Sequence, residues 1–196
     1  MGHNHYCQAC GRDIEHDYAC LHQVKITKIE VMIIYIMVIL LPILFIPKEI
    51  LLSAWIWESL LPSTALSLGV ILFILTLGNM VLNRPYLALF FGCHQKKDRS
   101  PMFFHKAWVL CTRCTGIYLG IIFMIISYWF ILPWWVYLIF ALPLAIDGIL
   151  QQKGILSSST PRRWITGILF GFFLVFGINL MIYGMMTIAS WIVGFL

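Results

Sequence analysis

Long runs of apolar residues alternate with short polar stretches along residues 25–196. Five of these runs are long enough to cross a membrane as a helix, at residues 29–46, 64–82, 115–132, 135–150 and 164–183. A helix of about 20 apolar residues spans the hydrocarbon core and satisfies its own backbone hydrogen bonds there. The pattern therefore predicts an all-α integral membrane protein with about five transmembrane helices.

Three further apolar segments do not fit this pattern of spans. Residues 50–61 place two tryptophans beside an acid, which is typical of a helix in the headgroup region, and Pro62 then indicates the start of the second span. Residues 86–92 are too short to cross and are expected to form a re-entrant or interfacial segment. The uncharged residues 184–196 either prolong the last helix or lie along the opposite membrane surface.

Composition and charge extend this picture. The 196 residues are 61% hydrophobic and 11% charged, far from the averages of soluble proteins. The first 28 residues are polar and lack the apolar core of a signal peptide, so we expect them to be retained in the cytoplasm.

The basic residues predict an orientation. With a cytoplasmic amino terminus, only Lys48 of the thirteen lysines and arginines falls on the outer side. This bias predicts a multi-pass protein of the plasma membrane whose amino terminus is cytoplasmic. The same orientation places the six cysteines and six histidines in a reducing compartment. Metal ligation or thiol chemistry is more common there than structural disulfides.

Residues 1–24 are expected to form a small zinc-ribbon-like module ahead of the helical domain. The candidate ligands are Cys7, Cys10, Cys20 and His22. Two cysteines separated by two residues form a tight turn that presents two thiolates to one tetrahedral ion, and a second pair about ten residues later can complete the shell. His16 with Cys20 is the alternative second pair. The spacing predicts a zinc site; a flexible tail with inert thiols is the competing interpretation.

A second group of soft ligands precedes the third apolar run. The candidate ligands are Cys93, His94, Cys111 and Cys114. In one hypothesis these residues bind zinc or another transition metal. In the other, Cys111 and Cys114 form a redox-active dithiol at a helix amino terminus, where the helix dipole and Arg113 lower the thiolate pKa. A third interpretation is that these cysteines only fill contacts between helices.

A short pattern occurs at the start of both the third and the fifth spans. Thr115-Gly116-Ile117 with Gly120 matches Thr166-Gly167-Ile168 with Gly171, and glycines four residues apart let helices approach closely. Four arginines lie near these two starts: Arg99, Arg113, Arg162 and Arg163. They favour an anion-binding site, such as a pocket for a lipid phosphate. Basic residues are also ordinary at the cytoplasmic ends of spans.

Asp147 lies inside a predicted span. A charge at the membrane centre costs about 2.5–3.5 kcal/mol on insertion scales, so this side chain should face protein or a polar cavity. We expect Asp147 to pair with one of the arginines, and a role in a substrate or ion site is the alternative.

Four segments together resemble the membrane family known as domain of unknown function 2085 (DUF2085). They are CHQ with the following RS at 93–100, CTRCTGIYLG at 111–120, DGILQ at 147–151 and RRWITGILFG at 162–171. The resemblance covers roughly residues 84–180. It implies that these positions, including Gln95, form one site, and it supplies no reaction.

Three classes of function remain open. The leading hypothesis is a membrane protein that binds a transition metal such as zinc, either as a structural ion or for trafficking. The second is an enzyme at the inner leaflet, either a CxxC thiol oxidoreductase or one that recognises an anionic lipid headgroup. The third is a membrane scaffold that docks a soluble protein through the zinc module. The sequence has no nucleotide-binding glycine loop, and we expect no nucleic-acid partner.

Overall fold

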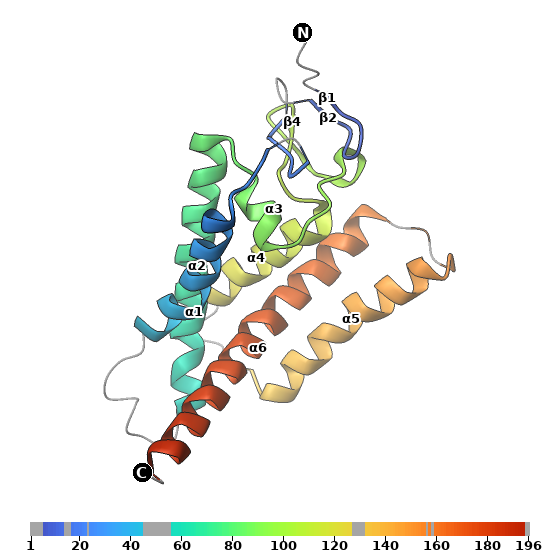
Figure 1. Ribbon diagram of the computed structural model, residues 1–196. Coiled ribbons are helices and arrows are strands. Elements are labelled where there is room, and N and C mark those ends of the chain that lie inside the picture. Colours follow the sequence, from blue (N-terminus) through green and yellow to red (C-terminus); the bar gives the residue numbers. More distant parts are fainter. Residues whose placement is uncertain are drawn as a thin grey trace.

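The protein is mainly helical, and its polar connections gather at one end of the helices (Figure 1). The computed structural model describes residues 6–13, 17–22, 24–44, 56–126, 132–155, 157 and 159–194. The longer helices are α1 (Lys28–Leu44), α2 (Ile56–Leu82), α4 (Thr112–Ile126), α5 (Trp134–Gln152) and α6 (Thr160–Gly194). The predicted helical class is therefore confirmed.

Short elements fold before α1 and between α2 and α4. They are the helix α3 (Tyr86–Phe90), the 3-10 helix η2 (Lys97–Arg99), the antiparallel pair β1 (Tyr6–Cys7) and β2 (Arg12–Asp13), and the antiparallel pair β3 (Met102–Phe103) and β4 (Lys106–Ala107). The labelled elements among them lie at the end where α4 and α6 begin (Figure 1). As expected for residues 86–92, α3 is too short to cross a membrane.

Within the described residues, three helical segments are long and apolar enough to cross a membrane. They are Ser63–Leu82, Trp134–Gln152 and Thr160–Ala189, with mean hydropathies of 2.3, 1.5 and 2.3, and α4 is a shorter apolar helix. Large apolar side chains such as Phe73 and Leu142 are exposed on these helices, as expected for a surface in contact with lipid. The structure therefore supports several spans, whereas the number five stays a prediction.

The predicted helix start at Pro62 is wrong, whereas the predicted second span, 64–82, agrees with the apolar segment Ser63–Leu82. A single helix, α2, begins at Ile56, so residues 56–61 are not a separate interfacial helix. A proline removes one backbone donor. In a lipid environment, however, the remaining backbone groups find their hydrogen bonds only within the helix, and this favours its continuation. Residues 50–55 lie outside the described part of the chain.

The other boundaries differ at the helix ends. The predicted residues 45–46 and 127–131 lie outside the described ranges. Helix α6 exceeds the predicted 164–183 and continues to Gly194, so the last residues prolong the helix as far as that residue. At 1.5 Å per residue its 35 residues reach about 52 Å, so α6 either tilts or projects beyond the hydrocarbon core.

Helices α4 and α6 pack side by side, in the same direction, through matched glycines (Figure 1). A Cβ atom added at Gly116 would lie 2.8 Å from the carbonyl oxygen of Trp164 and 3.0 Å from Cα of Gly167. One added at Gly171 would lie 2.8 Å from Cα of Gly120. The repeated glycine pattern is therefore the contact between two helices, and it brings their first turns together.

Candidate metal sites

A tight turn between β1 and β2 holds the first two candidate ligands. Gly11 follows Cys10 with φ +69°, a conformation that side chains other than hydrogen rarely adopt. The Gly11 N–H donates to the carbonyl oxygen of Cys7 at 2.8 Å and closes the turn. The backbone therefore presents Cys7 and Cys10 to one centre, as in zinc sites built from this spacing.

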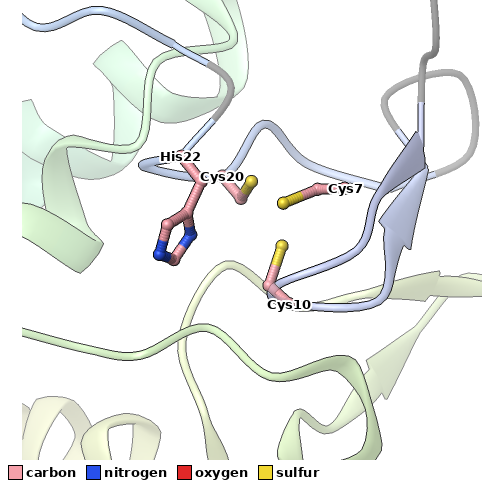
Figure 2. Close-up of side chains that lie close together, drawn as sticks. All are labelled: Cys7, Cys10, Cys20 and His22. Atoms are coloured by element: carbon pink, nitrogen blue, oxygen red, sulfur yellow. The ribbon is translucent and has the colours of Figure 1, made fainter.

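Cys20 and His22 join these cysteines in an N-terminal cluster (Figure 2). Ligand atoms of the four residues all lie within 4.8 Å of one another. The three sulfur atoms point toward a common centre, with the imidazole to one side (Figure 2). The cysteines are buried and the histidine is exposed. Cys20 with His22 is thus the second pair that the structure brings to the turn, and His16 lies outside the described residues.

Three other cysteines form a core cluster at the start of α4. The sulfur atoms of Cys93, Cys111 and Cys114 lie within 4.8 Å of one another. Cys111 directly precedes α4, and Cys114 lies in its first turn. The Cys93 sulfur accepts N–H bonds from Cys111 at 3.2 Å and from Gln95 at 3.5 Å. Such donors favour the thiolate, which is the form that binds metal ions.

The thiols within each cluster influence one another. The side chains of Cys114 and Cys93 hydrogen-bond to the Cys111 thiolate and hold the pKa of Cys111 below its ordinary value. The hydrogen bond between Cys93 and Cys111 raises the pKa of Cys93. In the N-terminal cluster, burial and the neighbouring thiols raise the pKa of Cys10 to about 12. Thiolates so close together repel one another, and a cation between them would let all of them ionise.

The structure does not bring His94 into the core cluster. His94 is exposed, and its Nδ1 accepts the backbone N–H of Lys96 at 3.1 Å. Within the described ranges the core cluster therefore holds three of the four candidate ligands.

Gln95 joins two distant parts of the chain. Its buried side chain donates to the carbonyl oxygens of Ala19 at 3.3 Å and Val109 at 3.2 Å, and it accepts the N–H of Leu21 at 2.7 Å. These bonds connect the segment around Cys20 with the segment that leads to Cys111. The position of Gln95 supports a role in holding the two clusters in place.

Arg12 has a similar role that the sequence did not indicate. Its charged side chain is completely buried, although Arg12 lies near the amino terminus, just after the turn that holds Cys7 and Cys10. Its acceptors are the carbonyl oxygens of Gln95 at 2.6 Å, Ala107 at 3.0 Å and Trp108 at 2.6 Å, and Ser100 Oγ at 2.8 Å. The N-terminal cluster therefore packs against the loop that carries the core cluster.

Asp17 adds a second connection between these segments. Its carboxylate forms an ion pair with Lys97 at 2.9 Å and accepts the N–H groups of Ala107 at 3.1 Å and Asp13 at 3.2 Å. Burial alone would raise the pKa of Asp17, but these partners outweigh it and hold the pKa below its ordinary value.

Asp147 pairs with arginine, as the sequence predicts. The buried carboxylate accepts a hydrogen bond from Arg113 and lies 3.7 Å from the Arg162 guanidinium. Gln151 donates to both carboxylate oxygens at 2.8 Å and accepts from Arg113 at 3.0 Å. The acid is therefore compensated within the protein and fixes Arg113 beside the core cluster.

A pocket of about 170 Å³ opens beside the core cluster. Its lining residues are Gly92, Cys93, His94, Arg99, Cys111, Arg113, Cys114, Gln151 and Arg163. Three of the four arginines proposed for anion binding thus line one pocket, while Arg162 lies beside Asp147.

Comparisons with known proteins place most of these residues within one family match. The family model described as predicted membrane protein (DUF2085) matches residues 93–177. An uncharacterised protein of Methanocaldococcus jannaschii is 41% identical over 92 residues, which cover 43% of this chain and 59% of the relative. An uncharacterised protein of Methanothermobacter thermautotrophicus is 35% identical over 83 residues, which cover 39% of this chain and 74% of the relative. No solved structure matches the chain. The family match contains the core cluster and Asp147 and leaves the N-terminal cluster outside.

Proposed function

Because the chain belongs to the DUF2085 family of predicted membrane proteins, whose description states no activity, we propose a function from its side-chain clusters. The proposal is a multi-pass membrane protein that binds zinc at two sites near one membrane surface. The observation that carries it is the meeting of three cysteine sulfur atoms in each of two clusters. Zinc favours tetrahedral sites of thiolate and imidazole ligands.

The core cluster supports metal binding over simple dithiol chemistry. A redox pair needs only Cys111 and Cys114, and their place at the start of α4 keeps a thiol oxidoreductase as the second candidate. The third sulfur, from Cys93, is buried with the pair and receives two backbone N–H groups. Dithiol redox chemistry does not require a third sulfur atom, whereas a zinc site requires at least three protein ligands.

The two sites differ in the role that they support. The N-terminal cluster offers four ligands, which is the complete set of a structural zinc site. It also packs on the chain's own loop through Arg12, which favours a structural role over a docking surface for a soluble partner. The core cluster offers three protein ligands and borders a pocket. Three ligands with an open position are typical of zinc that binds a further ligand.

Metal analysis of the purified full chain tests this proposal. Without chelator, the protein should contain roughly two zinc ions per chain, because each cluster supplies enough ligands for one ion. Cys10→Ser and Cys111→Ser should each lower the content to roughly one. The control His94→Ala should keep both ions, because His94 lies outside the core cluster.

Two further measurements make the zinc result decisive. Cobalt in place of zinc should give the strong visible absorption of tetrahedral thiolate sites, and each serine variant should lose part of it. Thiol counting on the same samples reports oxidation. A metal-free protein with a reversible Cys111–Cys114 disulfide would replace the zinc proposal by the oxidoreductase.

The membrane arrangement belongs to the same proposal. Five spans, with α1 and α4 as the first and third, place both clusters at the cytoplasmic surface of the plasma membrane. The directions of the helices support this arrangement. Helices α2 and α5 end at the same end of the molecule at which α4 and α6 begin, as successive membrane spans require (Figure 1). The excess of basic residues in the segments at this end gives the orientation.

Labelling of two introduced cysteines tests the orientation. Phe104 is 97% exposed in the loop at the cluster end, and Trp134 is exposed at the start of α5, at the opposite end. In intact cells an impermeant maleimide should label Trp134→Cys, and Phe104→Cys should react only after the membrane is opened. The unmodified chain is the control for its own cysteines, of which only Cys114 is not fully buried. The reverse labelling pattern would place the clusters outside the cell.

A further inference from the structure

The pocket beside the core cluster concentrates positive charge from separate elements. Arg99 ends η2, Arg113 lies in the first turn of α4, and Arg163 lies in the first turn of α6. Guanidinium groups repel one another, so their convergence is unfavourable unless negative charge lies between them. The cavity of about 170 Å³ is far larger than the roughly 15 Å³ that one water molecule needs. It leaves room for a tetrahedral oxyanion.

The described carboxylates beside Arg99 and Arg113 offset only part of the charge of these two arginines. No acidic residue lines the pocket in the described part of the chain. Asp147 is shared between Arg113 and Arg162, and among the described residues the ion-pair partner of Arg99 is the exposed Asp98 at 3.6 Å. The Nε atom of Arg113 is buried and makes no hydrogen bond among the described residues. A zinc ion with three thiolates would add one net negative charge, which the arginines exceed.

We propose that this pocket binds a phosphoryl oxyanion through Arg99, Arg113 and Arg163. Arginine pairs with phosphate through two parallel N–H···O bonds, and the first N–H groups of α4 add donors at the same place. In one respect the inference rests on the proposed function. All three core cysteines line the pocket, so a zinc ion held by them would lie beside it, with a fourth coordination position that these cysteines do not fill. A phosphate oxygen is a suitable ligand for that position.

Two sources could supply this chemistry. The pocket lies where α4 and α6 begin, which is the level at which the headgroups of phospholipids meet a membrane protein. An anionic phospholipid headgroup and a soluble phosphate therefore offer the same group to the same arginines.

The experiment uses the full chain purified in detergent, with two probes. Inorganic phosphate is titrated by calorimetry, and bound lipid is identified by native mass spectrometry after reconstitution in phosphatidylcholine vesicles containing phosphatidic acid. Arg99→Gln and Arg163→Gln should each weaken phosphate binding by roughly tenfold, because each removes a charge-assisted contact. Lys153→Gln is the matched control, since it removes one exposed positive charge outside the pocket.

The outcomes separate the sources. Phosphate binding with retention of phosphatidic acid, both reduced in the arginine variants, supports the inference with a lipid source. Phosphate binding alone supports it with a soluble source. Absence of both, or binding that the arginine variants leave unchanged, overturns the inference. Arg163→Lys keeps the charge and loses the paired donors, so it should bind with intermediate affinity even if Arg163→Gln folds poorly.

Zinc analysis of the same samples keeps this inference distinct from the proposed function. Phosphate binding by a zinc-free protein would reject the zinc site and leave the arginine pocket. Two zinc ions without phosphate binding would do the reverse. If Cys111→Ser also weakens phosphate binding while the three arginines are intact, the anion contacts the metal ion.

Discussion

Replacement of Arg12 by leucine should lower the free energy of unfolding by about 3–5 kcal/mol, because two buried and two part-buried acceptors lose their donors together. The midpoint of thermal unfolding in detergent should fall by roughly 10 °C. Zinc content should also fall at both sites, since Arg12 connects the turn of the N-terminal cluster to the loop that leads to Cys111. The measurement combines a thermal scan with metal analysis.

Two variants show whether the effect comes from this connection. Arg12→Lys keeps the positive charge but lacks the planar fork that reaches four acceptors, so it should show an intermediate loss. Arg84→Leu removes an arginine whose bond to the Lys25 carbonyl, at 3.3 Å, is exposed, and it should change the midpoint little. Equal small effects at Arg12 and Arg84 would show that the N-terminal cluster does not depend on this contact.

The helices could largely be predicted from the sequence, for a physical reason. Lipid requires a long apolar run to satisfy its own backbone, so each run becomes a helix whatever its neighbours do. Helix ends depend on less decisive signals. Pro62 is a favourable first residue of a helix, yet α2 begins at Ile56 and runs through it.

The candidate sites could be predicted only in part. The Cys-x-x-Cys spacing locates two ligands because the chain between them is short, and Cys93 was a candidate because it adjoins His94 in the same polar stretch. The roles of Arg12 and Gln95 follow from hydrogen bonds between residues 74 or more positions apart, which no local pattern reveals. The position of His94 outside the core cluster likewise goes with a local hydrogen bond, in which its Nδ1 accepts the backbone N–H of Lys96.

Introduction of one methyl group between α4 and α6 is the second change that should strongly lower stability and ligand binding. In Gly171→Ala the new Cβ would lie 2.8 Å from Cα of Gly120 and would also meet the carbonyl oxygen of Ile117. These are backbone atoms that cannot rotate away, so the helices must separate, at a cost of about 1–3 kcal/mol. Separation would also move Arg113 and Cys114 away from Arg163. Phosphate affinity and core zinc content should therefore fall along with the thermal midpoint.

Gly177→Ala provides the control within the same helix. A Cβ at Gly177 meets no atom within 4 Å, so this change should leave stability unchanged or raise it by up to about 1 kcal/mol through the better helix propensity of alanine. The difference between the two alanine variants then measures the α4–α6 contact alone, because the substitution and the helix are the same. A Gly171→Ala protein with normal stability, zinc and phosphate binding would show that the glycine contact does not set the spacing of the site. A protein that keeps its stability but loses phosphate affinity would show that the site depends on this spacing more sensitively than the fold does.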